Sequence, residues 1–307
     1  MARISDDIKE SFRSGNALTR LILVNLGVYI VYLLLKIIGN LMQVDIAGVF
    51  TDIFALPSNL GKLALRPWTL VTYMFYHQSF WHIFFNLLWL YFGGQLFMEY
   101  FGGRRLLSTF LIGGLIGGGL YVLFYNIFPA FQEAVMISNN RGASAGIMAI
   151  IVGIATYHPR YPVQLFFVLT VPLWGIAAGF VLLDLIGLGD GAGNPGGRIA
   201  HLGGAAFGFF MARAAKEGKD ITAGFSQFVE NIQNWFTPKP KIRKVYSKSK
   251  AGGKVGKNGK ANVRRDTRRS KADDQARLDE ILDKISRSGY DSLSKEEKDH
   301  LFKIGRD

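Results

Sequence analysis

Apolar stretches separated by short polar connections dominate the first 236 residues of the chain. A helix that crosses a bilayer needs about 20 mainly apolar residues, and six segments approach or reach that length. They run roughly over Ala17–Ile38, Trp81–Tyr100, Leu106–Phe128, Ser144–Tyr157, Pro162–Gly187 and Ile199–Ala215. The pattern predicts an all-α fold, a polytopic membrane bundle of six transmembrane helices. The fourth and sixth segments are short, so we expect other helices rather than lipid to surround them.

The pattern changes after residue 236 and divides the chain into three parts. Residues 1–236 form the predicted membrane domain. Residues 237–271 are rich in Pro, Lys, Gly and Ser, which predicts a basic disordered linker because such a segment cannot bury a core. In residues 272–307, apolar residues recur at helical spacing from Leu278 to Ile285, and a capping box from Ser294 to Glu297 opens a second helix. This part is expected to be a small cytoplasmic helical hairpin, whose partner the sequence does not identify.

Charge is concentrated in one place. The net charge is +13, and the segment from Lys239 to Lys271 carries fourteen Lys and Arg against the single acid Asp266. Next to a membrane, such a cluster favours anionic lipid by about 1 kcal/mol per charge, and we do not expect a nucleic-acid partner. Basic residues are also denser on one side of the predicted spans, which places both termini in the cytoplasm by the positive-inside rule.

There is no cysteine, so disulfides, thiolate metal sites and a cysteine nucleophile are excluded, and no metal or cofactor is indicated.

Four polar side chains fall in one layer of this bundle. With the orientation above, His82, Ser144 and His201 each lie within about a turn of the outer end of a span, and Asn86 lies one turn below His82. An ionisable group within a membrane is costly and is usually functional. A serine and a histidine at the same depth suggest a nucleophile and its base.

Small residues on the fourth and sixth spans explain how the serine and the histidine can meet. Gly142, Gly146, Ala149 and Gly153 share one face, and His201, Gly204 and Gly208 share another. This spacing allows helix backbones to approach closely.

Three sequence motifs carry a resemblance to a known family. They are His82-Ile83-Phe84-Phe85-Asn86, Gly142-Ala143-Ser144-Ala145 and the stretch from Ala200 to Gly208, together with His77 and the segment Gly94–Arg105. In this order and on these helices they resemble the rhomboid intramembrane serine proteases of bacterial type. The resemblance covers about residues 17–215 and implies a multi-pass protein of the cell membrane, the inner membrane of a bacterium.

The resemblance assigns catalytic roles. It makes Ser144 the nucleophile and His201 the general base, with His82 and Asn86 binding the oxyanion beside the Ser144 backbone N–H. No carboxylate is expected in this layer, so we expect a Ser–His dyad. Two positions depart from the family pattern: Met148 replaces an aromatic residue, and Trp68 is followed by Thr69 instead of arginine.

The segment from Asp184 to Arg198 contains six glycines, which predicts a flexible loop between the fifth and sixth helices. The resemblance makes this loop a cap over the site. It also makes the fifth helix, with Phe166, Phe167 and Trp174, a lateral gate. Asp184 is interpreted as a helix cap or as the partner of a local arginine.

The leading interpretation is an intramembrane serine endopeptidase that cleaves transmembrane segments of other membrane proteins near the outer membrane face. The alternative is a catalytically silent rhomboid-like protein that binds membrane helices, although such members usually lack the serine or the histidine. A small-solute transporter is less favoured, because polar residues gather in one outer layer and there is no internal repeat.

Overall fold

The structure is a computed structural model that describes residues 15–165, 169–190 and 193–236, and in the tail 279–281, 283–285, 293–294 and 296–298. The predicted basic linker, residues 237–271, lies outside the described residues. The chain separates into two compact units, Met1–Pro240 and Lys241–Asp307. The elements of the first unit are α2 (Ala17–Met42), α3 (Ile46–Phe54), β1 (Leu56–Pro57), α4 (Leu60–Leu65), α5 (Thr69–Thr72), η1 (Tyr73–Phe75), α6 (Phe80–Ile127), η2 (Pro129–Ala134), β2 (Asn139–Asn140), α7 (Ser144–Tyr157), β3 (Pro162–Leu165), β4 (Leu169–Pro172), α8 (Leu173–Gly189), α9 (Pro195–Lys216) and α10 (Ala223–Phe236).

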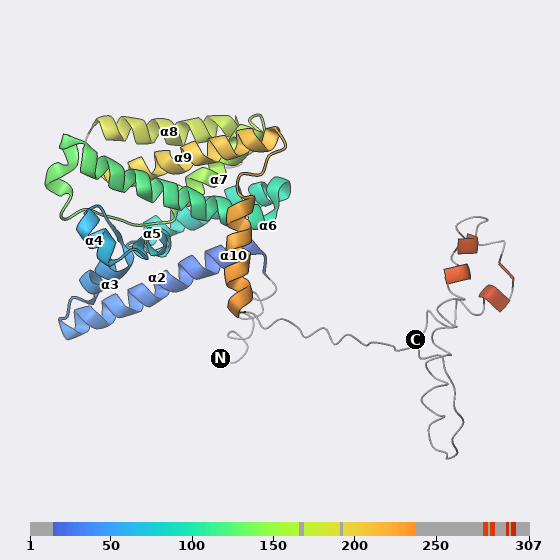
Figure 1. The fold of residues 1–307 in the computed structure, drawn as a ribbon, viewed down its shortest axis with the longest axis horizontal. Helices are drawn as coiled ribbons and strands as arrows, with labels where there is room; N and C mark the ends of the chain where they lie inside the picture. Colours follow the sequence, from blue (N-terminus) through green and yellow to red (C-terminus); the bar gives the residue numbers. More distant parts are fainter. Residues whose placement is uncertain are drawn as a thin grey trace, which may run out of the picture. The chain divides into compact units, whose positions relative to one another are not determined.

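The first unit is a helix bundle around α7, as the apolar pattern predicts. Long stretches of α6, α8 and α9 run in similar directions, with α7 among them (Figure 1). Every residue of α7 from Ala145 to Ala155 is buried. This helix has 14 residues, and its burial agrees with the expectation that neighbouring helices surround a short span. By length and composition, α2 and α6 can cross a membrane, while α7 and α8 are shorter apolar helices.

A kink divides α6 into the second and third predicted spans. Gly102 has φ 75° and ψ 167° within this 48-residue helix. A positive φ is costly for residues with a Cβ, so glycine suits this position. Beyond the kink, Gly113 packs against Ala149 and Gly117 against the Ala200 carbonyl. Gly113 and Gly117 therefore serve close packing of this half against α7 and α9.

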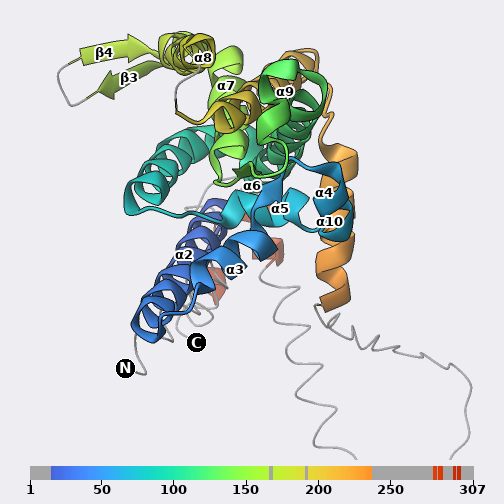
Figure 2. The ribbon, with the colours of Figure 1, turned by 90° about the vertical axis from the view of Figure 1, so that its left-hand side faces the viewer.

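The prediction for the fifth span is wrong over its first half. The span was expected from Pro162, but α8 begins at Leu173. The preceding residues form an antiparallel hairpin in which Pro162 pairs with Pro172 and Val163 with Val171. Proline lacks the amide hydrogen that a helix interior requires, and one proline stands at each end of this hairpin. The hairpin of β3 and β4 projects sideways from the start of α8 (Figure 2).

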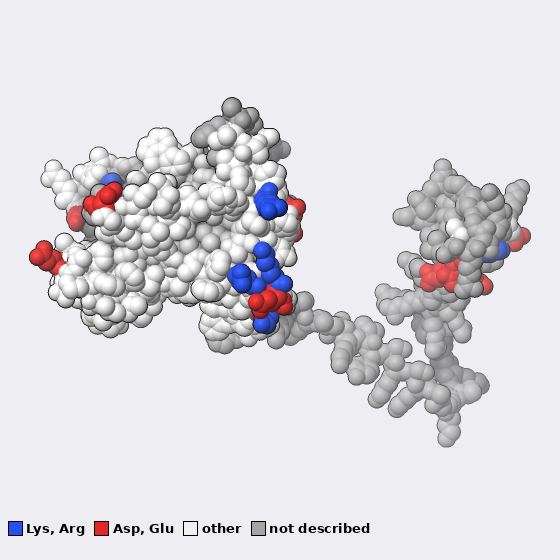
Figure 3. All heavy atoms as spheres, turned by 90° about the horizontal axis from the view of Figure 1, so that it is seen from above, with Lys and Arg blue, Asp and Glu red and all other residues white. Residues whose placement is uncertain are grey.

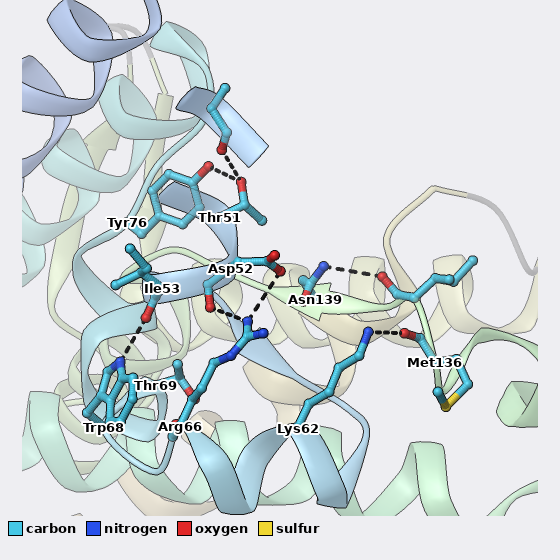
Figure 4. Close-up of polar contacts among 12 residues, drawn as sticks. Thr51, Asp52, Ile53, Lys62, Arg66, Trp68, Thr69, Tyr76, Met136 and Asn139 are labelled. Atoms are coloured by element: carbon cyan, nitrogen blue, oxygen red, sulfur yellow. Dashed lines mark hydrogen bonds and ion pairs between the residues drawn. The ribbon is translucent and has the colours of Figure 1, made fainter. Parts of the chain in front are cut away.

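The connection between α2 and α6 folds back on itself through polar contacts (Figure 4). Arg66 forms an ion pair with Asp52, with 3.3 Å between Nη1 and Oδ1. The Trp68 indole N–H donates to the Ile53 carbonyl at 2.9 Å, and the Thr69 hydroxyl donates to the Arg66 carbonyl at 2.7 Å. Thr69, which departs from the family pattern, thus stabilises the turn that carries Arg66.

Helix α10, which the apolar pattern did not predict, packs at one end of the bundle. In both ribbon views α10 runs across the direction of α8 and α9 (Figures 1 and 2). Arg105 forms a 2.7 Å ion pair with Asp220 just before α10, and Ser108 bonds to Ser226 at 2.7 Å. Partial burial raises the pKa of Asp220, but the hydrogen bonds from Arg105 and Thr222 outweigh it and lower that pKa below its ordinary value. Charged side chains gather at this end (Figure 3).

In the described part of the second unit, the predicted capping box is confirmed. The Ser294 amide donates to the Glu297 carboxylate at 2.7 Å, and the Glu297 amide donates to the Ser294 hydroxyl at 3.3 Å. Lys284 forms an ion pair with Glu297 at 2.9 Å. The remainder of the predicted hairpin lies outside the described residues.

Candidate active site

Ser144 and His201 are in direct contact. Ser144 is the first residue of α7. His201 lies in the second turn of α9, which begins at Pro195 behind the N-cap residue Asn194. The Ser144 Oγ lies 2.7 Å from the His201 Nε2. This distance fits transfer of the hydroxyl proton to the imidazole.

The close approach of α7 and α9 makes this contact possible. A Cβ on Gly204 would lie 2.8 Å from the Ala145 carbonyl carbon, and a Cβ on Gly208 would lie 2.9 Å from the Ala149 carbonyl carbon. Both separations are shorter than any ordinary contact of a Cβ atom. The small-residue faces predicted from the sequence therefore bring the two backbones together, and His201 lies one turn before Gly204.

His82 and Asn86 stand on the first turns of α6, which Ser79 caps by accepting from the His82 amide at 3.3 Å. The His82 ring lies beside Gly142, where a Cβ would approach its Cε1 and Nε2 to 2.7 Å. Gly142 also has φ 113°, a second reason for glycine. The Asn86 side chain is buried and donates to the His82 carbonyl at 2.8 Å. An amide group has two donor hydrogens, so this bond leaves one for another acceptor.

His77 supports the backbone next to the serine. It is fully buried, and its Nε2 accepts from the Ala143 amide at 3.4 Å. Its ring lies 4.9 Å from that of His82. Burial, and then the neighbouring His82, lower the pKa of His77 from 6.5 to about 3. The neutral ring can therefore serve as an acceptor at physiological pH.

The expectation that no carboxylate shares this layer is wrong. Both carboxylate oxygens of Asp184 lie 3.1 Å from the His201 Nδ1, on the opposite side of the ring from Ser144. Asp184 was interpreted as a cap or as the partner of an arginine. It lies five residues before the end of α8, whose C-cap is Asp190, and the guanidinium of Arg198 donates to the Gly187 carbonyl. Because α8 is almost uniformly apolar, its sequence does not show which face turns toward His201.

Comparison with known proteins places the chain in a family. A family model described as the rhomboid domain matches residues 64–217, which is half of the chain. The chain belongs to the rhomboid family. It is similar to RHOMBOID-like protein 12, mitochondrial, of Arabidopsis thaliana, at 33% identity over 150 residues, or 46% of this chain and 44% of that protein. The matched stretch spans less than half of the relative.

The rhomboid family is of the intramembrane protease type and acts on transmembrane substrates. With its apolar helices, the chain is therefore a membrane protein. A second family model, described as a family of unknown function (DUF6576), matches residues 262–304 in the tail.

The polar residues of the candidate site line one cavity of about 510 Å³. The four predicted site residues and Asp184 line it together with mainly apolar side chains. Met148, which departs from the family pattern, is one of these side chains and forms part of the cavity wall. Arg141, just before the Gly142 turn, also lines it, and the sequence reading had not assigned it to the site. Among the described residues, no group of three or more His, Cys, Asp or Glu could hold a metal.

The predicted flexible loop between the fifth and sixth helices is shorter than expected. Helix α8 continues to Gly189 and α9 begins at Pro195, so the connection is shorter than the predicted loop from Asp184 to Arg198. Of the glycines in the predicted loop, Gly196 belongs to α9 and packs against the Tyr121 ring.

The lateral gate of the fifth helix stays a prediction. Trp174 is exposed at the start of α8, and Phe166 and Phe167 lie outside the described residues. Phe180 contacts Trp89 of α6 edge to face, with ring centroids 4.8 Å apart. Both residues line the cavity.

Proposed function

We propose that this rhomboid is an intramembrane serine endopeptidase that cleaves transmembrane segments of other membrane proteins. The observation that carries the proposal is the 2.7 Å contact between the Ser144 hydroxyl and the His201 Nε2 inside a mainly apolar cavity. A lone serine in a membrane helix usually bonds to its own backbone. Here its hydroxyl reaches a base on another helix, which is the arrangement that activates a serine nucleophile.

In the proposed reaction, the Ser144 oxygen attacks a peptide carbonyl while its proton passes to His201. The protonated imidazole then gives this proton to the leaving amine, and a water molecule repeats the sequence on the acyl-enzyme. The developing oxyanion requires donors that are already in place. The Ser144 amide, at the start of α7, has no acceptor within its helix. It would act with the second Asn86 hydrogen and with His82.

A substrate would enter between α6 and α8, where Trp89 and Phe180 meet. A peptide bond inside a regular helix is shielded, so the substrate must unwind locally before its carbonyl reaches Ser144. We therefore expect faster cleavage of segments that contain glycine or other helix-weakening residues near the scissile bond. We place cleavage near the outer membrane face.

The proposed topology has six spans, formed by α2, the two halves of α6, α7, α8 and α9, with both termini in the cytoplasm. The end of the bundle that carries Arg104, Arg105, Arg213 and Lys216 would face the cytoplasm by the positive-inside rule. The basic linker that follows would then lie beside anionic lipid. The setting would be a bacterial inner membrane.

The test is cleavage of a purified transmembrane reporter in liposomes by the parent protein and by Ser144→Ala and His201→Ala. We expect the parent to form product and both variants to form none. Equal product from all three would attribute the cleavage to a contaminant. Folded parent that binds reporters without cleaving them would favour the alternative, a catalytically silent protein that binds membrane helices.

A further inference from the structure

Asp184 occupies a position where a carboxylate is costly without a partner. Its helix is almost entirely apolar, and the neighbouring Leu185 and Ile186 side chains are both 51% exposed. The Asp184 side chain is 13% exposed. Acidic residues within membrane helices usually face the bundle interior and mark functional positions.

The direction of Asp184 is set by its helix. Phe180 and Asp184 are four residues apart and therefore lie on one face of α8, and both line the cavity. This face brings the carboxylate to the His201 Nδ1, with both oxygens at 3.1 Å. On the far side of the same ring, Nε2 meets the Ser144 hydroxyl. The imidazole is thus held at both nitrogens by groups from two different helices.

We propose that Asp184 is a positioning residue that holds His201 in the tautomer and orientation needed for proton transfer, an inference that rests on the proposed serine-protease reaction. As acceptor for the Nδ1 hydrogen, the carboxylate leaves the Nε2 lone pair free to take the Ser144 proton. It then stabilises the imidazolium while the bond between the serine oxygen and the substrate carbon forms. Asp184 itself keeps its charge throughout, and the proton passes from Nε2 to the leaving amine.

The orientation of the His201 imidazole and its contact with Ser144 depend on three helices. Ser144 belongs to α7, His201 to α9 and Asp184 to α8. A displacement of α8 away from the bundle would separate the carboxylate from Nδ1 even if α7 and α9 stayed together. The position of α8 and the orientation of the imidazole are therefore coupled.

The experiment compares the parent with Asp184→Asn, Asp184→Ala and the control Asp190→Asn, all as full-length protein in liposomes. Asp190 is an exposed carboxylate directly after α8, so its substitution removes a similar charge outside the site. Two rates are measured, cleavage of a transmembrane reporter and labelling of Ser144 by a fluorophosphonate. The label reports the activated serine without a protein substrate. Thermal unfolding in detergent verifies that each variant is folded.

We expect both Asp184 variants to lose at least about 1,000-fold in kcat with little change in KM, and to label more slowly, while Asp190→Asn behaves as the parent. Added formate, a small carboxylate, should restore part of the rate in Asp184→Ala, and neutral formamide should not. This rescue separates a charged partner of the imidazole from a residue that only fills space.

Cleavage and labelling within about threefold of the parent in folded Asp184→Asn would overturn the inference while the proposed function stands. A loss confined to Asp184→Ala that formate does not restore would also overturn it. A parent that labels but cleaves no reporter would contradict the proposed function alone, and the labelling rates would still decide the role of Asp184. A parent that neither labels nor cleaves overturns both.

Discussion

Replacement of Gly204 by alanine should separate the two helices that carry the serine and the histidine. The added Cβ would lie 2.8 Å from the Ala145 carbonyl carbon, and closer still to its oxygen. Carbon atoms pack best at about 3.5–4.0 Å, so α7 and α9 must move apart by about 1 Å. Gly204 is one turn after His201 and Ala145 directly follows Ser144, so the displacement acts at the site itself.

The expected magnitude follows from that shift. Overpacking costs about 1–3 kcal/mol, and the higher helix propensity of alanine offsets about 1 kcal/mol of it. A 1 Å separation would lengthen the 2.7 Å bond between Ser144 and His201 beyond the usual range of a hydrogen bond. A displacement of this size can cost about 100-fold in rate. Activity should therefore fall much more than stability.

The assay is reporter cleavage beside thermal unfolding in the same detergent, with Gly119→Ala as the matched control. Gly119 is an exposed glycine of α6 with nothing within 4 Å of an added Cβ, so alanine there should be neutral or slightly stabilising. Parent-like cleavage by folded Gly204→Ala would refute the idea that close packing of α7 and α9 sets the distance between serine and histidine.

Three further outcomes are expected. Because folded His77 resists protonation to about pH 3 while its ordinary pKa is 6.5, acid favours the unfolded state. The unfolding free energy should fall by about 2 kcal/mol between pH 6.5 and about pH 5. Thermal unfolding over a series of pH values should show a smaller fall for His77→Gln. A fall identical to that of the parent would show that His77 is not its source. Arg105→Gln removes the ion pair that lowers the pKa of Asp220, so α10 should detach more readily. Amide exchange in α10 should then rise, and unchanged exchange would assign the anchoring to other contacts. Ser294→Ala breaks the capping box with Glu297 and should weaken that helix by about 1 kcal/mol, read by amide exchange at Glu297.

The site was largely predictable from the sequence because its chemistry depends on short motifs. Ser144 and His201 each begin or nearly begin a helix, and the glycines near them are spaced for close packing. The spacing of these glycines and the positions of the motifs on their helices therefore predict that Ser144 and His201 meet. The buried α7 and the kink after Tyr100 also follow from the apolar pattern.

Asp184 and the β3–β4 hairpin were not predictable in the same way. The contact of Asp184 depends on the rotation of α8 about its axis, which an almost uniformly apolar helix does not reveal in its sequence. The hairpin was read as helix because Val163, Leu165, Leu169 and Val171 are apolar enough to continue a span. The prolines at 162 and 172 are the sequence signal against a continuous helix here.

The short α8 has a consequence for the surrounding bilayer under the proposed topology. Its 17 residues rise about 25 Å, whereas the hydrocarbon core is about 30 Å thick. The hairpin before it cannot complete the crossing, because the unpaired outer edges of β3 and β4 need water or headgroups as partners. Unlike α7, α8 exposes Leu182, Leu185 and Ile186 and so meets lipid directly. Hydrophobic mismatch at this helix should thin the membrane locally, on the side where Phe180 and Trp89 meet.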